Sequence, residues 1–101
     1  MPQPPLIQNR QSFHEHMERA CLRSQEKIAS NPDWDLPQNI VRQLLFMKQC
    51  TDDGRIPTAD EREKPNVGVL AMRNFEESDE EFASWLSGLN YAFRRYHQLP
   101  G

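Results

Sequence analysis

The sequence predicts an all-α protein, a compact single-domain bundle of three main helices with one or two short helices. Three stretches carry apolar residues at helical spacing, and residues that start or stop helices bound each of them. The chain of 101 residues has room for one modest core, and its five Phe, two Trp and two Tyr residues argue against a disordered chain. We expect a single domain over residues 1–101, in which the proline-rich residues 1–10 form a loose N-terminal arm.

The first main helix is expected to begin at a capping box formed by Ser12 and Glu15 and to end at Asn31-Pro32. The second is expected to begin at Asp35, with Pro37 in its first turn, and to end before Gly54. Its apolar residues cover too wide an arc for one contact, so we expect neighbours on two sides. These residues are Ile40, Val41, Leu44, Leu45, Phe46, Met47 and Cys50.

The second half of the chain contains two further capping boxes, Thr58–Glu61 before a short helix and Ser78–Glu81 before the last main helix. Alternation at residues 67–72 would also permit a strand, but no other segment offers a partner strand, so a short helix is favoured. The last helix carries a narrow apolar stripe of Phe82, Trp85, Leu86, Leu89, Phe93 and Tyr96. We expect Trp34 to fold back over the core, although an exposed anchor is the alternative.

Several classes of function are disfavoured by composition. The formal net charge of −3 argues against nucleic-acid binding, because such a surface repels phosphate backbones. No apolar run approaches the length of a membrane span or resembles a signal peptide, so we expect a cytoplasmic protein without a membrane partner. Cys21 and Cys50 lie on apolar stripes, which fits buried thiols in a reducing compartment.

No set of residues suited to catalysis or metal binding is found in the sequence. His14 and His16 are two residues apart, so on a helix they point in different directions and cannot share an ion. His97 has no recognisable partner, and no glycine-rich phosphate loop is present. The prediction is a protein without enzymatic activity, cofactor or metal.

Two features of the last third of the chain are candidate contact sites for a protein partner. Five carboxylates fall within residues 76–81, and an acidic lip of this kind suits a cationic cleft. Small residues and a tyrosine on the outer face of the last helix would let another backbone approach. The candidate contacts are Glu76, Glu77, Asp79, Glu80, Ser84, Ser87, Tyr91 and Arg95. The alternative is that the acids serve the helix N-terminus and that the outer face is simply solvated.

Three stretches together resemble a known family. Residues 20–47 are a helix, an Asn-Pro-Asp-Trp joint and a helix rich in Gln, Leu and Ile; residues 67–75 are a Gly-containing apolar segment that ends in Arg-Asn-Phe; and residues 76–81 are an acidic turn. In this order they resemble the small helical immunity proteins of type VI secretion, specifically the family whose best-known member neutralises an NAD(P)+-hydrolysing toxin. The proline-rich arm and the tail at 94–101 depart from that pattern.

The resemblance implies a cytoplasmic protein that binds a secreted antibacterial toxin domain one to one and blocks its substrate cleft. The toxin would consume NAD, transfer an ADP-ribosyl group or use another nucleotide. Two alternatives remain at this point. One is an adaptor or chaperone for a secreted effector that leaves the effector's enzyme active, and the other is a homodimer that buries the wide arc of the second helix and an exposed Phe46.

Overall fold

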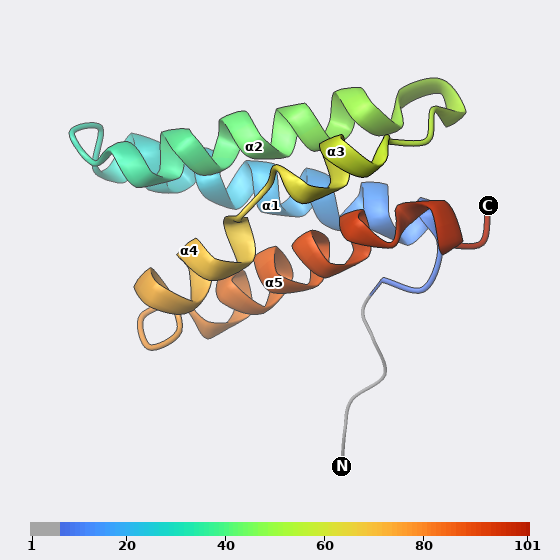
Figure 1. Ribbon diagram of the computed structural model, residues 1–101. Helices are drawn as coiled ribbons and strands as arrows, with labels where there is room; N and C mark the ends of the chain where they lie inside the picture. The colour runs from blue at the N-terminus through green and yellow to red at the C-terminus, as the bar shows by residue number, and fades with distance from the viewer. Residues whose placement is uncertain (1–6) are drawn as a thin grey trace, which may run out of the picture.

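The computed structural model describes residues 7–101, and its elements are all helical (Figure 1). In chain order they are α1 (Arg10–Ser30), α2 (Asp35–Thr51), the 3-10 helix η1 (Asp52–Gly54), α3 (Ala59–Glu63), α4 (Val67–Asn74), α5 (Glu80–Arg94) and the 3-10 helix η2 (Tyr96–Gln98). Over this range no strand is present, so the predicted all-α class is confirmed, with three long helices and the short α3 and α4. The segment whose alternation allowed a strand is helix α4.

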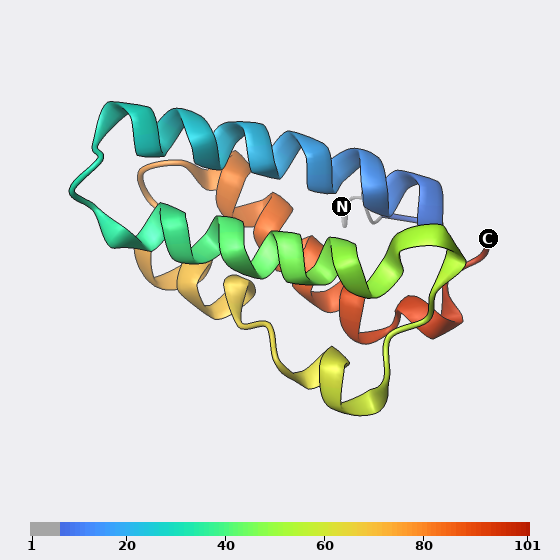
Figure 2. The same cartoon turned by 90° about the horizontal axis from the view of Figure 1, so that it is seen from above.

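The helices form two layers. One is the antiparallel hairpin of α1 and α2, and the other is the antiparallel hairpin of α4 and α5, with α3 linking them along one side (Figure 1). Seen from above, α5 crosses beneath the first hairpin at an angle (Figure 2). The molecule measures 36 × 34 × 20 Å, and its short dimension fits two layers of helices.

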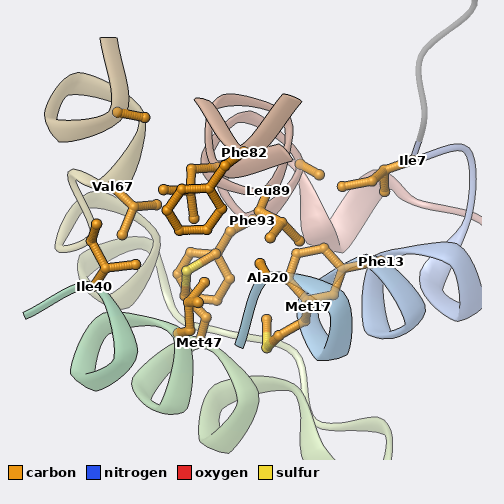
Figure 3. Packing of buried hydrophobic residues seen from close by; sticks show 14 of the residues in the cluster. Ile7, Phe13, Met17, Ala20, Ile40, Met47, Val67, Phe82, Leu89 and Phe93 are labelled. Carbon is orange, nitrogen blue, oxygen red and sulfur yellow. The ribbon is translucent and has the colours of Figure 1, made fainter. Parts of the chain in front are cut away.

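The core fills the space between the layers (Figure 3). Phe13 of α1 lies 6.5 Å from Phe93 of α5 between ring centroids, and 5.2 Å from Tyr96. On α2, one row of the wide apolar arc is buried, including Ile40 and Leu44. Because such burial stabilises roughly in proportion to the apolar area removed from water, these rows hold the hairpins together.

On α2, Phe46 is less exposed than expected, whereas Leu45 is more exposed. The ring of Phe46 is half-buried against Phe93 at 6.4 Å and lies under the Lys64 ammonium group at 5.7 Å. Phe46 is therefore less exposed than the homodimer alternative assumed. Leu45 is the exposed apolar residue of this helix. Trp34 contacts the end of the core, as expected, with its ring 5.5 Å from Phe75, but the residue is also 37% exposed.

Two helices begin with a different cap from the one predicted. The cap of α1 is Asn9, whose side chain accepts a bond from the Ser12 N–H at 2.8 Å while the Ser12 hydroxyl accepts from the Asn9 N–H. The cap of α5 is Asp79 in place of Ser78. In both places the competing residue is Asn or Asp, which caps at least as well as serine. The Thr58–Glu61 capping box is confirmed.

The start of the chain is more ordered than a loose arm would be over residues 7–10. Ile7 is buried against the core, and α1 already begins at Arg10. The Arg10 N–H donates to the Pro100 carbonyl at 3.0 Å, which ties the start of α1 to the C-terminal segment. The rest of the predicted arm, residues 1–6, lies outside the described residues.

Candidate partner-binding surface

The acidic segment forms the tight turn between α4 and α5. The Phe75 N–H donates to the Ala71 carbonyl at 2.8 Å, and the Asp79 N–H donates to the Phe75 carbonyl at 2.8 Å. These two bonds satisfy carbonyl groups that the end of a helix leaves without partners. They also hold Glu76 and Glu77 on the outside of the turn, where both are exposed.

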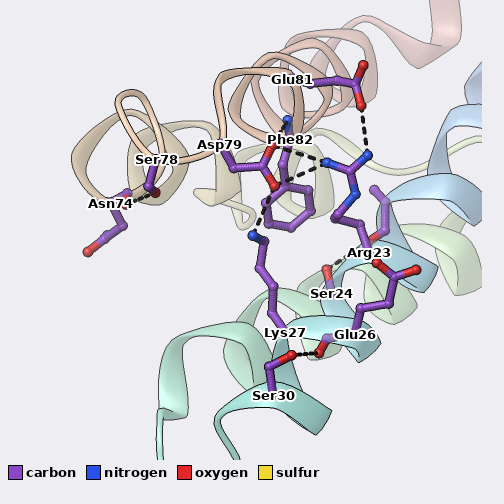
Figure 4. Close-up of polar contacts among 11 residues, drawn as sticks. Arg23, Ser24, Glu26, Lys27, Ser30, Asn74, Ser78, Asp79, Glu81 and Phe82 are labelled. Carbon is purple, nitrogen blue, oxygen red and sulfur yellow. Dashed lines mark hydrogen bonds and ion pairs between the residues drawn. The ribbon is translucent and has the colours of Figure 1, made fainter.

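Asp79 and Glu81 both reach α1, although the Glu81 side chain stays 64% exposed (Figure 4). Both carboxylate oxygens of Asp79 lie 3.1 Å from one guanidinium nitrogen of Arg23, and the Lys27 ammonium group lies 2.9 Å away. Glu81 binds the other terminal nitrogen of Arg23 at 2.7 Å. Asp79 also accepts the Phe82 N–H at 3.2 Å as the N-cap of α5. The acidic segment therefore fastens the two layers of the fold together.

Aromatic rings complete this cluster. The Arg23 guanidinium group lies 4.6 Å from the ring centroid of Trp85, and the Lys27 ammonium group lies about equally far from Phe75 and Phe82, at 5.0 and 5.1 Å. Cations over aromatic faces are stabilised by the ring quadrupole. Burial of the Asp79 carboxyl favours its neutral form, but the bonds from Lys27, the Phe82 N–H and Arg23 outweigh burial, and the pKa of Asp79 is lowered.

Three of the predicted acidic contacts remain on the surface. Glu76, Glu77 and Glu80 are exposed, and no ion pair within the described residues engages them. Asp79, the fourth, is occupied by Arg23 and Lys27. We call these three residues, Glu76, Glu77 and Glu80, the acidic lip.

The outer face of α5 continues from this lip. Glu80, Ser84, Ser87 and Tyr91 follow one another at spacings of four, three and four residues, which places them on one face, opposite the buried stripe. Ser84 is exposed, and Tyr91 is 61% exposed. The Arg95 guanidinium group stacks on the Tyr91 ring at 4.7 Å and pre-orders it.

Beside this face, α4 and α5 enclose an open groove of about 450 Å³. It is lined by Gly68, Val69, Met72, Arg73, Ser87, Asn90, Tyr91 and Arg94. Val69 and Met72 are each about half exposed, and the Ser87 hydroxyl is buried without a hydrogen-bond partner in the described structure. We call the groove, the outer face of α5 and the acidic lip the α4–α5 surface.

The predicted contacts on the outer face of α5 are brought together, but sequence reasoning did not select the α4 side of the groove. Val69 and Met72 are apolar residues that lie off the helical stripe of α4, which runs through Val67 and Ala71. This offset could have identified both residues from the sequence, because an apolar residue off the core stripe of a helix faces solvent or a partner.

Comparison with family models matches residues 13–95 to the family described as Tsi6. The chain belongs to the Tsi6 family. This family comprises immunity proteins of type VI secretion, and the matched range contains all of α2 to α5. No curated protein and no solved structure matches the chain. Membership of the Tsi6 family supports an immunity role and suggests a function without catalysis.

His14 and His16 of this Tsi6-family protein contact other groups of the fold, and its two cysteines are partly or fully buried. His14 shares a hydrogen bond with the Tyr96 hydroxyl at 3.2 Å, whereas His16 contacts the Ser12 carbonyl at 2.9 Å. Both cysteines are free thiols, and burial raises the pKa of each. Among residues 7–101 no group of three or more His, Cys, Asp or Glu side chains is arranged to hold a metal ion. Over the same residues, no helix has both the length and the apolarity of a membrane span.

Proposed function

We propose that this protein is an immunity protein that binds one copy of a cognate secreted antibacterial toxin domain in the cytoplasm and occludes its active site. The observation that carries this proposal is the Tsi6-family match over residues 13–95. No cofactor takes part in the proposed mechanism, since occlusion requires only that the bound protein fill or cover the substrate cleft.

The α4–α5 surface is the part of the molecule best suited to this contact. Val69, Met72 and Tyr91 offer apolar area, and the small side chains of Ser84 and Ser87 allow close approach. Interfaces draw most of their affinity from a few such residues in a desolvated centre, with tyrosine among the commonest. Tyr91, held by Arg95, is the anchor we assign to the middle of the interface.

The charge of the acidic lip favours one class of toxin, the enzymes that use NAD or another nucleotide. Enzymes that consume NAD, transfer ADP-ribosyl groups or use other nucleotides bind phosphates, and their clefts tend to be cationic. The exposed carboxylates of Glu76, Glu77 and Glu80 complement such a cleft, which speeds encounter and fixes the orientation of binding. We therefore assign the lip to the entrance of the toxin's substrate cleft.

The experiment uses the purified domain of the cognate toxin and follows turnover of its nucleotide substrate. Added immunity protein should abolish turnover at an equimolar ratio, with a Kd of about 1 nM or below. Absence of association at micromolar concentrations would refute the proposal. Tight association with undiminished turnover would instead identify an effector adaptor.

Two sets of variants test the surface. Tyr91→Ala should weaken toxin binding by about 30-fold or more, the usual effect of losing a central aromatic contact. Its control is Leu22→Ala, an exposed apolar residue on the other layer, which should leave toxin affinity unchanged. If both variants bind like the unmodified protein, the α4–α5 surface is not the interface.

Reversing Glu76 and Glu77 to lysine should lower the association rate and its dependence on salt, because the lip steers encounter. The matched control reverses Asp60 and Glu63, two exposed acids on α3, with the same change in net charge. Equal effects from the two pairs would mean that only the total charge matters and that the lip has no special position in the complex.

A further inference from the structure

A second groove, which the proposed function does not use, lies on the other layer of the molecule. It is formed by α1 and α2, has a volume of about 420 Å³ and is lined by His14, Met17, Glu18, Cys21, Leu22, Gln25, Val41, Leu45 and Lys48. Leu22 is 61% exposed and Leu45 is 52% exposed. Two leucines exposed to this extent beside one groove mark a surface suited to another protein.

The residues that line the groove face one another in register. Glu18 on α1 and Lys48 on α2 both line the groove, 12 residues before Ser30 at the end of α1 and 13 residues after Asp35 at the start of α2, so in the antiparallel hairpin they lie near the same point along the groove. Leu22 follows Glu18 by one turn, about 6 Å along α1, and Leu45 precedes Lys48 by about 4.5 Å along α2. Because α1 and α2 run antiparallel (Figure 2), both leucines lie on the side of the charged pair that is nearer the turn at residues 31–34.

This arrangement is complementary to itself. A two-fold axis along the groove places α1 of one copy over α2 of the other and α2 over α1. Leu22 then meets Leu45 of the second copy, and Glu18 meets Lys48, with each contact made twice, as in any isologous interface. From this match we infer that the α1–α2 groove is occupied by a second copy of this chain.

The charges select this orientation. A two-fold axis that crosses the groove at the level of Glu18 and Lys48 would place α1 over α1 and α2 over α2, so that Glu18 faces Glu18 and Lys48 faces Lys48. Like charges in contact across an interface are repelled, whereas the axis along the groove gives two pairs of opposite charge. The leucine rows supply apolar contact in the centre, and the charged rows fix the direction.

The groove is small, so the dimer is expected to be weak. Stable interfaces bury roughly 800 Å² on each partner, and a patch of a few side chains buries less than that. We therefore expect a dimer with a Kd of about 10–100 µM. The dimer leaves the α4–α5 surface free, since that surface belongs to the other layer. The inference therefore does not rest on the proposed function.

Sedimentation equilibrium of the full chain from about 5 to 500 µM should show a monomer–dimer equilibrium, and Leu45→Glu should be monomeric throughout. Tyr91→Ala, on the opposite surface, should dimerise like the unmodified protein. A monomer at every concentration, or an unchanged dimer in Leu45→Glu, would overturn the inference. So would a weaker affinity of Leu45→Glu for the toxin domain, because the groove would then belong to the toxin interface.

Exchanging the charges tests the orientation. Glu18→Lys alone should weaken the dimer by about tenfold, because two favourable pairs become repulsive. Adding Lys48→Glu in the same chain should restore it, since each lysine again meets a glutamate across the axis. Circular dichroism should show unchanged helicity for both variants. Failure of the second change to restore association would overturn the proposed geometry.

Discussion

Replacing Asp79 by asparagine and by alanine separates its two roles in the fold. Asparagine keeps an oxygen that can accept the Phe82 N–H as the N-cap of α5, but it removes the charge that faces Arg23 and Lys27. Alanine removes both. The side chains of these three charged residues are 19–28% exposed, so the ion pairs lie between the surface and the interior.

The expected magnitudes follow from that geometry. Loss of an N-cap costs about 1 kcal/mol. Each ion pair contributes about 1 kcal/mol, the upper end for surface pairs, because both partners are partly buried and hydrogen-bonded. Asp79→Asn should therefore lower the free energy of unfolding by about 2 kcal/mol and Asp79→Ala by about 3 kcal/mol. A domain of this size has about 5–15 kcal/mol in total, so the loss is readily measured.

Urea unfolding followed by far-UV circular dichroism gives these values directly. The control is Glu77→Gln, an exposed acid in the same turn, which should change stability by less than about 0.5 kcal/mol. If Asp79→Asn is as stable as the unmodified protein, the ion pairs do not hold the layers together. If the asparagine and alanine variants are equally unstable, the cap contributes nothing.

The same pair of proteins gives a pH dependence. The pKa of Asp79 is lowered in the folded state, so its charge stabilises the fold above the unfolded pKa of about 3.9. That contribution is lost as the pH falls through the folded pKa. The stability difference between the unmodified protein and Asp79→Asn should be constant near neutral pH and should disappear in acid. A difference that persists in strong acid would contradict the assignment.

Three further predictions concern other parts of the fold. Asn90→Ala should destabilise the protein by about 2–3 kcal/mol in urea unfolding, because it removes a buried acceptor 2.8 Å from the Gly68 N–H. Arg55→Ala should raise the carboxyl pKa of Glu61 from about 2 in a carbon-detected NMR titration, because after the bond from the Thr58 N–H, which this change keeps, the bond from the Arg55 guanidinium group is the next largest cause of the lowering. Cys21 should react with iodoacetamide more slowly than a free thiol near about pH 8, because burial raises its pKa and outweighs the opposing effect of Lys48.

The helices were predictable from sequence because periodicity and capping report on local structure. The capping box at Thr58 was placed correctly, since no stronger capping residue lies beside it. At α1 and α5 the helix began at a neighbouring Asn or Asp, because several adjacent residues could cap and only the final backbone path decides between them. The assignment of residues 67–74 to a helix rested on the absence of a partner strand, which proved sufficient.

The sequence could not show which acids of residues 76–81 form ion pairs with α1, because these pairs join residues far apart in the chain. Arg23 and Asp79 are 56 positions apart, and nothing local to either residue reveals the other. Sequence reasoning therefore treated all the acids of this segment as one lip. The groove beside Tyr91 was missed for a similar reason, since its walls come from both α4 and α5.

The resulting charge pattern gives the α4–α5 surface a direction. Glu76 and Glu77 lie in the turn before α5 and Glu80 begins it, whereas Arg94 ends the helix, about 21 Å from Glu80, and Arg95 follows directly. The acids lie at the N-terminal end of α5, where the helix dipole is positive, and the arginines lie at the C-terminal end, where it is negative. The charges that stabilise the helix therefore also polarise the surface. A net charge of −3 conceals this separation. In the complex that we propose, a toxin docked in the reverse sense would bring its cationic cleft against Arg94 and Arg95, and this repulsion would exclude that orientation.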